Sequence, residues 1–584
     1  MVTYSERPWL KHYDAGVPKT LAYPDITLDQ FLTQAAQKSP DDIALNSSAR
    51  LPLFGRVAFE MSFQELDRLS DALAAGLVKL GLKKGERVVI VMGNIPAFVI
   101  SFYAILKAGG VVAATNPTYP EERLEYQIND CGARIIITMS LFYKLVKKVQ
   151  PKTVSQHVIV TNIKEYLPKL ARPLFTLARE KKHGHRVEQL ASGDYWFQDI
   201  IKSNMGSKPN VALAPADLAL FQYTGGTTGV SKAAMATHRN LVANTVQMRA
   251  FLTISEEDAN NGFLGAIPLF HVFGMVAVLS VSVAIGAKLI LVPSARDINE
   301  VIDCIHTFRP AMFHGVPALY NAINNHPDVR SGKIDLTSIR GCVSGSAPLP
   351  PSTKQTFEKL SGGKLLEGFG MSEAPTATHC NPMNGENREG SIGIPLPDMD
   401  MRIVSLEDGE TDVPVGEVGE LVMAGPQVMQ GYHGMPEETA NVLRKRDGKI
   451  WLYSGDIARM DEDGYFYIVD RKKDMALIGG FNVYPNDVEK VLAAHPAVLE
   501  VGVAAIPHPD KPGAEALKAW IVLKPNAAVT EAELIDFASQ SLPRYEVPTR
   551  FAFINELPKT AVGKTLRREL VRLEKETNQG VPQT

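Results

Sequence analysis

The chain has few cysteines and no pattern that would use them together. Its 584 residues include four cysteines, which are Cys131, Cys304, Cys342 and Cys380. They lie far apart and form no CxxC pair, so the sequence indicates neither a zinc site nor a disulfide framework. A reducing, cytoplasmic compartment fits this composition best.

The chain also has no excess of positive charge. The formal net charge is -3, and no basic arm or basic domain stands out along the chain. A protein that binds nucleic acid through its phosphates normally needs such a surface. The composition therefore argues against a nucleic-acid partner.

No stretch has the features of a signal peptide or of a membrane span. Glu6, Arg7 and Pro8 stand where a signal peptide needs its apolar core, so secretion is not expected. The apolar stretch 88–106 is broken by the turn residues 93–96. The stretch 271–287 is short for a span and rich in small residues, which predicts a buried core helix.

The composition is that of a globular protein with more than one domain. Apolar residues make up 45% and charged residues 21%, and the length exceeds what one hydrophobic core usually supports. Helical periodicity alternates with short apolar runs typical of strands buried on both faces, which predicts layered α/β structure. The helical segments are 28–36, 62–77, 98–107 and 240–250, and the strand runs are 88–92, 109–114, 134–138, 157–161, 287–292, 311–313 and 341–344.

The pattern changes beyond about residue 390. Short strands separated by turn residues, at 401–404, 419–423 and 464–469, predict a small antiparallel sheet or barrel. The charged cluster 470–474 then precedes a small unit of helices and strands between 485 and 554. The predicted fold is α/β: a large N-terminal domain, 1–472, of layered α/β subdomains plus a small β-barrel-like subdomain, and a small α+β C-terminal domain, 473–584.

Segment 164–186 combines leucines and aromatic residues with many lysines and arginines. A basic, apolar segment of this kind is able to lie on a membrane surface. A solvated helical excursion explains the same pattern. Both interpretations remain open at this point.

A glycine- and threonine-rich loop follows the apolar run 218–221. Glycines let a backbone approach a ligand, threonines supply hydroxyls and a lysine supplies charge, so the loop suits a polyphosphate. It is not a Walker A loop, because Ser231 and Ala233 flank the lysine. A flexible turn is the alternative. The residues concerned are Thr224, Gly225, Gly226, Thr227, Thr228, Gly229 and Lys232.

Four further polar clusters follow this loop in a recognisable order, at 367–373, 453–456, 470–474 and 557–564. Together the five motifs resemble those of the adenylate-forming superfamily, which includes acyl-CoA synthetases, luciferases and peptide-synthetase adenylation domains. The resemblance covers about residues 28 to 572. The chain departs from the family pattern at Ser231, where proline is typical, and at Ala233, where glycine is typical.

The resemblance implies a nucleotide site. Phe369 would stack on adenine, Ser372 would contact the α-phosphate, and Asp456 and Arg471 would hold the ribose hydroxyls. Glu373, with the hydroxyl of Thr228, would bind Mg²⁺. The implied residues for ATP and AMP are Thr224, Gly225, Gly226, Thr227, Thr228, Gly229, Lys232, Gly345, Ser346, Ala347, Glu367, Gly368, Phe369, Gly370, Met371, Ser372, Asp456 and Arg471.

The resemblance also implies two catalytic residues and a moving domain. Lys564 would bridge the carboxylate and the α-phosphate during displacement. His271 would stand as a gate between the ATP site and the pantetheine tunnel, although a histidine among apolar residues is also typical of a core. Lys473 would be the hinge of a mobile C-terminal domain. The residues implied in the CoA tunnel are Gly479, Gly480 and Phe481.

The implied reaction joins a fatty acid to CoA at the expense of ATP, with Mg²⁺ as cofactor. The N-terminal residues 8–18 and the segment 164–186 are most similar to bacterial long-chain ligases. Alternatives are a medium-chain or aryl ligase, a fatty acyl-AMP ligase, or a non-catalytic protein that binds nucleotide or acyl-CoA. A homodimer and a cytoplasmic location, with peripheral contact at the inner membrane face, are further expectations.

Overall fold

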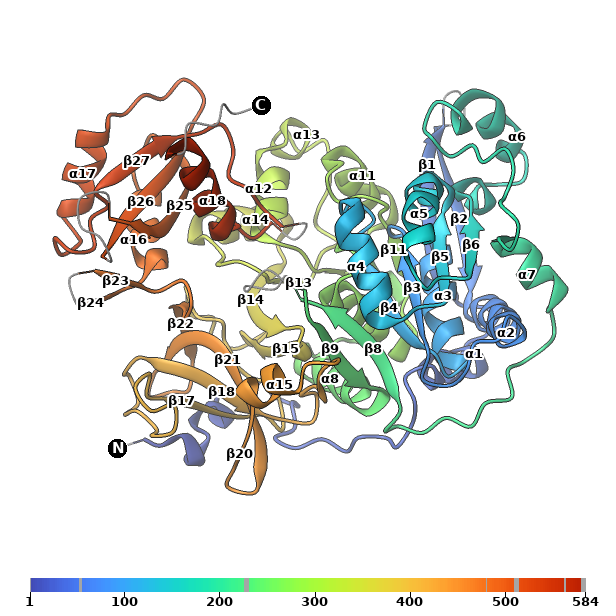
Figure 1. Ribbon diagram of the computed structural model, residues 1–584, viewed down its shortest axis with the longest axis horizontal. Helices are drawn as coiled ribbons and strands as arrows, with labels where there is room; N and C mark the ends of the chain where they lie inside the picture. The colour runs from blue at the N-terminus through green and yellow to red at the C-terminus, as the bar shows by residue number, and fades with distance from the viewer. Residues whose placement is uncertain are drawn as a thin grey trace. The chain divides into compact units, whose positions relative to one another are not determined.

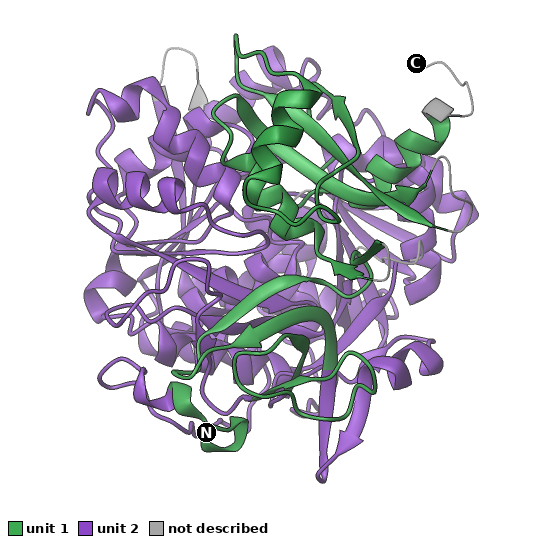
Figure 2. Ribbon diagram, turned by 90° about the vertical axis from the view of Figure 1, so that its left-hand side faces the viewer, with its two compact units in different colours: residues 1–9, 401–423, 453–584 green, residues 10–400, 424–452 purple. Residues whose placement is uncertain are grey.

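The computed structural model describes residues 2–51, 55–224, 231–478, 481–508, 514–560 and 563–578 (Figure 1). The chain divides into two compact units (Figure 2). The smaller unit comprises Met1–Trp9, Met401–Met423 and Tyr453–Thr584, and the larger unit comprises Leu10–Asp400 and Ala424–Leu452.

An eight-stranded sheet forms one layer of the larger unit. Its central strands are parallel and rich in valine, isoleucine and alanine, as expected for strands with helices on both faces. The sheet order is β19 (Gly431–Tyr432), β9 (Ala233–Thr237), β8 (Leu218–Tyr223), β4 (Val111–Thr115), β3 (Arg87–Val91), β5 (Ile135–Met139), β6 (His157–Thr161) and β7 (Tyr195–Trp196).

A nine-stranded sheet forms a second layer. Its middle strands are parallel, while β1 with β2 and β14 with β15 form antiparallel pairs. The order is β16 (Ile394–Pro395), β15 (Ala374–Cys380), β14 (Lys364–Met371), β13 (Gly341–Ser344), β12 (Met312–Phe313), β10 (Phe263–Gly265), β11 (Leu289–Leu291), β1 (Ile43–Leu51) and β2 (Gly55–Ser62).

Helices cover both sheets, and their ends follow local signals. The helix α2 begins after Ser62, whose hydroxyl accepts a hydrogen bond from the backbone N–H of Glu65 at 3.2 Å. The helices of this unit are α1 (Gln30–Lys38), α2 (Phe63–Lys79), α3 (Pro96–Lys107), α4 (Glu121–Cys131), α5 (Tyr143–Val149), α6 (Ala171–Phe175), α7 (Phe197–Ser203), α8 (His238–Phe251), α9 (Glu256–Asn261), α10 (Val281–Ala284), α11 (Ile298–Phe308), α12 (Pro317–Asn325), α13 (Pro327–Arg330), α14 (Pro351–Ser361) and α15 (Pro436–Val442).

The apolar stretch 271–287 forms a core helix, as predicted. The π-helical segment η7 (Phe273–Ser280) continues into α10, and every residue of η7 is buried. Among the residues described, no helix is both long and apolar enough to cross a membrane.

The smaller unit contains an antiparallel sheet and an α+β region. In the sheet, β18 (Gly419–Ala424) lies between β17 (Asp400–Val404) and β21 (Lys449–Met460), and β22 (Phe466–Arg471) pairs with β21. The α+β region buries an apolar core between its strands and helices. Its elements are β23 (Ala476–Ile478), β24 (Phe481–Val483), α16 (Pro485–Ala493), β25 (Val498–Pro507), β26 (Glu515–Leu523), α17 (Glu531–Ser539), β27 (Arg550–Phe553) and α18 (Arg567–Asn578).

The predicted fold class is confirmed. The structure is a mixed α/β fold, and the predicted strand runs of both regions appear as strands. The hairpin of β1 and β2 and the strands β14 and β15 were not expected from the sequence, because their residues lack a clear apolar alternation. The two compact units do not test the domain boundary at residue 472, which stays a prediction.

Candidate active site

The glycine- and threonine-rich loop joins two antiparallel strands, β8 and β9. The backbone N–H of Thr224 donates to the carbonyl of Lys232 at 2.9 Å, and the Ser231 hydroxyl donates to the carbonyl of Thr224 at 2.7 Å. Proline at position 231 would have no hydroxyl for this second bond, so Ser231 ties the two ends of the loop together. The predicted ligands Gly225, Gly226, Thr227, Thr228 and Gly229 lie outside the described residues.

Lys232 and Glu373 both contact Tyr432. The ammonium of Lys232 stands 5.3 Å from the centre of the Tyr432 ring and forms an ion pair with Glu438 of α15. The Tyr432 hydroxyl donates to Oε1 of Glu373 at 2.8 Å. The structure thus brings together the predicted phosphate-binding lysine and the predicted metal ligand.

Tyr432 and Glu438 were missed by the sequence reasoning. Acids are common in the first turn of a helix, because the positive end of the helix dipole stabilises their negative charge. Glu438 in the first turn of α15 therefore gave no functional signal in the sequence. Burial, and then the charge of Glu373, raise the pKa of Tyr432 well above its usual value. Tyr432 therefore remains protonated and donates to Glu373 at all ordinary pH values.

The surroundings of Glu373 fit a magnesium ion. This residue lies half-buried in the turn between β14 and β15, and Tyr432 occupies one of its oxygens. In the part of the chain that the structure describes, no three His, Cys, Asp or Glu side chains form a metal cluster. Mg²⁺ nevertheless commonly uses only one or two carboxylates together with phosphate oxygens, so a single carboxylate suffices.

The carboxyl ends of β13 and β14 form a wall of small residues. Ser344 pairs with Glu367 in the parallel register, so Gly345, Ser346 and Ala347 leave the sheet beside Gly368. A Cβ atom on Gly345 would stand 3.6 Å from the Gly368 carbonyl oxygen and 3.5 Å from the Phe273 ring. In α/β sheets, ligands bind outside the carboxyl ends of strands, so the position of these residues agrees with the predicted adenine contact, which stays a prediction.

Two other predicted residues of β14 have partners of their own. Phe369 packs edge-on against His379, with ring centres 5.9 Å apart. The carboxyl group of Glu367 accepts a hydrogen bond from the N–H of Leu349 at 3.2 Å, and burial raises its pKa to about 7. The predicted contacts of Glu367, Phe369, Gly370, Met371 and Ser372 with nucleotide stay predictions.

His271 lies two residues before η7. Its Nδ1 atom accepts from the N–H of Phe273 at 3.3 Å, and burial lowers its pKa to about 4. The imidazole is therefore neutral near pH 7. A neutral ring fits both a gate and a core histidine, so its catalytic role stays a prediction.

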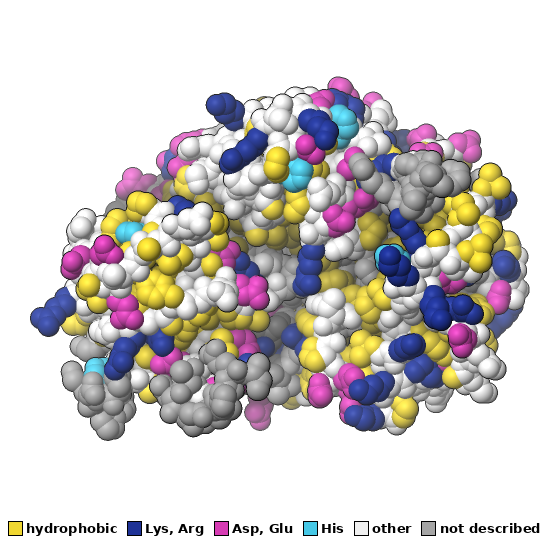
Figure 3. Space-filling model, turned by 90° about the horizontal axis from the view of Figure 1, so that it is seen from above, with side chains coloured by type: hydrophobic (Ala, Val, Ile, Leu, Met, Phe, Trp, Pro, Cys, Tyr) yellow, Lys and Arg dark blue, Asp and Glu magenta, His cyan; other side chains and the backbone are white. Residues whose placement is uncertain are grey.

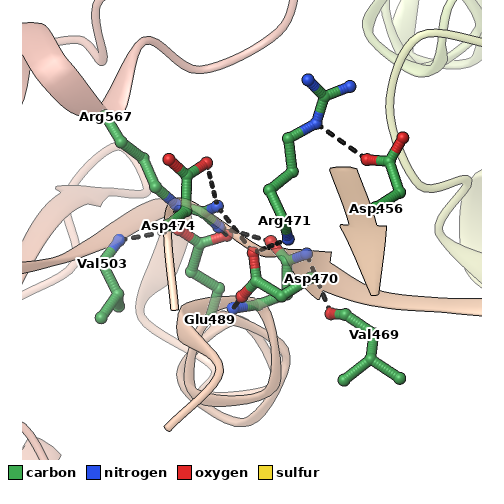
Figure 4. Close-up of polar contacts among 9 residues, drawn as sticks. Asp456, Val469, Asp470, Arg471, Asp474, Glu489, Val503 and Arg567 are labelled. Atoms are coloured by element: carbon green, nitrogen blue, oxygen red, sulfur yellow. Dashed lines mark hydrogen bonds and ion pairs between the residues drawn. The ribbon is translucent and has the colours of Figure 1, made fainter. Parts of the chain in front are cut away.

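Asp456 and Arg471 meet across β21 and β22 of the smaller unit (Figure 4). Nε of Arg471 donates to Oδ1 of Asp456 at 2.9 Å. Asp456 is only 2% exposed, and among the described residues nothing donates to its Oδ2. A buried carboxylate oxygen without a donor is costly, which points to a ligand hydroxyl at this position.

Lys564 comes close to this pair. Its turn is held by the N–H of Lys564, which donates to Thr560 Oγ1 at 3.1 Å, and by the N–H of Thr560, which donates back to the Lys564 carbonyl at 2.8 Å. Lys564 is exposed at the surface. Desolvation of its ammonium group by the surrounding atoms is nevertheless the main cause that lowers the pKa of Lys564 to about 8, and the positive charge of Arg471 is the second. The charge of Asp456 acts in the opposite direction, so the two side chains lie within electrostatic range.

This pKa predicts a pH dependence. Lys564 carries its charge below a pKa of about 8 and loses it as the pH rises further. Because the protonated amine is the form that stabilises negative charge, kcat/KM for adenylate formation should fall above pH 8. Pyrophosphate release measured from pH 6 to 10 tests this, and Lys564→Arg should remove the fall above pH 8 from whatever activity it retains. A flat profile up to pH 10 in the unchanged protein would contradict the assignment.

Arg567, at the start of α18, lies among three carboxylates of the smaller unit (Figure 4). Its guanidinium contacts Glu489 at 2.8 Å, Asp470 at 3.2 Å and Asp474 at 3.4 Å, and also bonds to Asn486. Asp470 is fully buried, and the Arg567 side chain is only 14% exposed. The arginine therefore neutralises the fully buried carboxylate of Asp470 and the largely buried carboxylates of Asp474 and Glu489.

Arg567→Ala should destabilise the protein by about 3–5 kcal/mol, because it leaves buried carboxylates unpaired. Chemical denaturation followed by fluorescence measures the change. Arg572→Ala is a matched control on the same helix, where the exposed arginine pairs with Glu569 and Glu576. This control should change stability by less than about 1 kcal/mol. Equal losses in both variants would refute the role given to Arg567.

The predicted hinge and tunnel residues are only partly described. Phe481 in β24 is exposed and stacks on Tyr545, with ring centres 4.5 Å apart. Burial lowers the pKa of Lys473, which follows β22. Gly479 and Gly480 lie outside the described residues. The roles of Lys473 and Phe481 stay predictions.

Comparison with known proteins gives concordant matches. Residues 32–433 match the model of the AMP-binding enzyme family, and residues 487–564 match its C-terminal domain. The long-chain-fatty-acid–CoA ligase of Bacillus subtilis is 42% identical, covering 98% of this chain and 99% of the relative. The ligase of the same name from Escherichia coli O6:H1 is 36% identical, covering 97% and 98%. The ATP-bound MatB structure from Rhodopseudomonas palustris is 25% identical with a TM-score of 0.79, covering 94% of this chain and 100% of that one.

Proposed function

The chain belongs to the AMP-binding enzyme family, and from this premise we propose that it is an AMP-forming ligase joining a long-chain fatty acid to CoA. A carboxylate oxygen of the acid attacks the α-phosphorus of ATP, and the bond to the β-phosphate oxygen breaks. Pyrophosphate leaves and acyl-AMP remains. The CoA thiol then attacks the acyl carbon, AMP departs, and the thiol proton passes to solvent.

The observation that carries the proposal is the arrangement around Asp456. This buried carboxylate keeps one oxygen without a donor among the described residues, beside Arg471 and near Lys564. A ribose offers neighbouring hydroxyls that suit the free oxygen. Lys564 then supplies a positive charge where the carboxylate and the α-phosphate must approach each other, because two anions repel without it.

In the larger unit, Lys232 and Glu373 are assigned to the phosphates. Lys232, which pairs with Glu438 in this structure, would turn to the phosphate oxygens when ATP binds. Mg²⁺, held by Glu373 and the hydroxyl of Thr228, would supply charge neutralisation of the phosphates when bound. Tyr432 keeps the Glu373 carboxylate oriented through its hydrogen bond. Gly345, Ser346 and Ala347, with Phe369, would receive the adenine.

The remaining assignments concern the second half-reaction. We assign residues 473–584 to a mobile domain with its hinge at Lys473, and Gly479, Gly480 and Phe481 to the CoA tunnel. Closure of such a domain would bring Lys564 to the first reaction and release it for the second. We also propose that the protein is a homodimer, and light scattering of the purified protein tests this. Its proposed location is the cytoplasm, with peripheral contact at the inner membrane face.

A long-chain acid is the preferred substrate because η7 and α10 offer a largely apolar, mostly buried neighbourhood with no charged side chain to pair with an ammonium group. Pyrophosphate release across acids of increasing chain length, with and without CoA, tests the proposal. Dependence on long-chain acids and on CoA supports it. Turnover of medium-chain or aryl acids only, or acyl-AMP that CoA never consumes, would indicate a different ligase. No pyrophosphate with any acid would exclude an enzyme of this kind.

A further inference from the structure

The helix α15 is held beside the end of the loop 224–232 by its contacts with β19. The backbone N–H of Tyr432 donates to Oγ1 of Thr439 at 2.9 Å. A Cβ atom on Gly431 would stand only 2.6 Å from Cγ2 of Thr439, so a side chain there would collide with the helix. Because β19 pairs with β9, which begins one residue after Lys232, these contacts place the first turn of α15 close to that lysine.

One acid of this turn forms an ion pair with the lysine. The carboxylate of Glu438 accepts a hydrogen bond from the Lys232 ammonium. Ion pairs between exposed side chains are ordinary and contribute little, and Figure 3 shows basic and acidic side chains interspersed over one face of the molecule. This pair differs because the Lys232 side chain is only 15% exposed, while that of Glu438 is 41% exposed. Since little water reaches the ammonium, a neighbouring anion stabilises it more than it would at the surface.

The same lysine is the one assigned to the phosphates. Its ammonium lies over the ring of Tyr432, whose hydroxyl donates to Glu373, the assigned metal ligand. The polyphosphate of ATP is strongly negative, and so is the pyrophosphate that leaves. A carboxylate attracts the same ammonium and repels these anions, and both effects weaken their binding. Glu438 therefore competes with substrate and product for one positive charge.

We propose that Glu438 is a positioning residue that sets how tightly this protein holds polyphosphate. It holds Lys232 between turnovers, gives the lysine up when ATP binds, and takes it back as pyrophosphate leaves. A ligand that must displace an internal partner binds more weakly by the factor that this partner contributes. The factor applies to ATP and to pyrophosphate alike, so Glu438 favours release of the product at the expense of affinity for the substrate. The inference rests on the proposed function, which assigns Lys232 to the phosphates.

Calorimetric titration of the full-length protein with magnesium pyrophosphate and with magnesium ATP, in the absence of fatty acid, tests this role. Glu438→Gln keeps the size of the side chain and removes its charge. Both ligands should bind this variant about fivefold more tightly, because Lys232 is no longer held by a carboxylate. Inhibition of adenylate formation by added pyrophosphate should strengthen by the same factor. The rate of adenylate formation in a single turnover at saturating ATP should stay the same, so the change falls on binding and release.

Two further variants make the test specific. Glu437→Gln removes one negative charge from the exposed neighbour on the same turn of α15, and it should leave both affinities nearly unchanged. Glu438→Asp keeps the charge, and it should bind both ligands more weakly than Glu438→Gln does. A misfolded variant would lose affinity, so misfolding does not imitate the expected gain.

The inference is overturned if Glu438→Gln binds pyrophosphate no more tightly than the unchanged protein, or if Glu437→Gln shows the same gain. Either result with normal turnover of fatty acid leaves the proposed function standing. The titrations need neither an acid nor turnover. A protein that binds pyrophosphate but releases none with any acid would therefore contradict the proposed function, while its titrations would still report on Glu438.

Discussion

Lys564→Ala should lower acyl-adenylate formation about 100- to 1,000-fold and leave thioester formation from supplied acyl-AMP nearly unchanged. The first reaction brings a carboxylate to a phosphate, and the Lys564 ammonium lies within electrostatic range of Asp456, the predicted ribose ligand. The second reaction starts from an adenylate that already carries the activated acyl group, so it does not need this charge.

Two assays separate these steps: pyrophosphate release reports the first, and release of AMP from synthetic acyl-AMP and CoA reports the second. Lys559→Ala is the matched control, because Lys559 lies in the same region and pairs with Glu500 at the surface. It should leave both rates unchanged. An equal loss of both steps in Lys564→Ala would remove the assigned role.

Glu373→Gln should reduce adenylate formation by about 100-fold or more, since a bound metal ion contributes several kcal/mol of charge stabilisation. The substitution keeps an oxygen that accepts the hydrogen bond of Tyr432 and removes only the negative charge. The Mg²⁺ concentration for half-maximal rate should rise in parallel. A titration of the initial rate with MgCl₂ at saturating ATP measures both effects.

Glu437→Gln provides the control for Glu373→Gln. Glu437 is an exposed acid in the first turn of α15, next to the partner of Lys232. Its replacement removes one negative charge from the same region without touching the assigned ligand, so the Mg²⁺ midpoint should not move. If Glu373→Gln keeps the midpoint and the rate of the unchanged protein, the metal assignment is wrong.

Short-range patterns carried most of the fold prediction. Runs such as 88–92 and 134–138 are apolar along their whole length, because strands between two layers of helices are buried on both faces. The same reasoning identified 271–287 as a core segment. It failed for β15, where polar and small residues form a buried strand between β14 and β16 that also contacts η7 and α8.

Some residues of the candidate site were likewise predicted from the sequence, and others were found only in the structure. The resemblance of the five motifs to the adenylate-forming superfamily indicated Lys232, Glu373, Asp456, Arg471 and Lys564. Neither Tyr432 nor Glu438 stood out, since a tyrosine after glycine and an acid at a helix start are ordinary in sequence. Their contacts reach across 59 residues, from Tyr432 to Glu373, and 206 residues, from Glu438 to Lys232.

The sequence by itself determined the class of fold, the residue types of the loop 224–232 and the order of the motifs, because periodicity, glycine content and charge are local properties of a chain. Only the tertiary structure decided that Ser231 bonds to Thr224, that Tyr432 contacts both Lys232 and Glu373, and that Asp456 keeps a buried oxygen without a donor among the described residues. Hydrogen bonding and burial depend on which distant residues become neighbours, and that is set by packing.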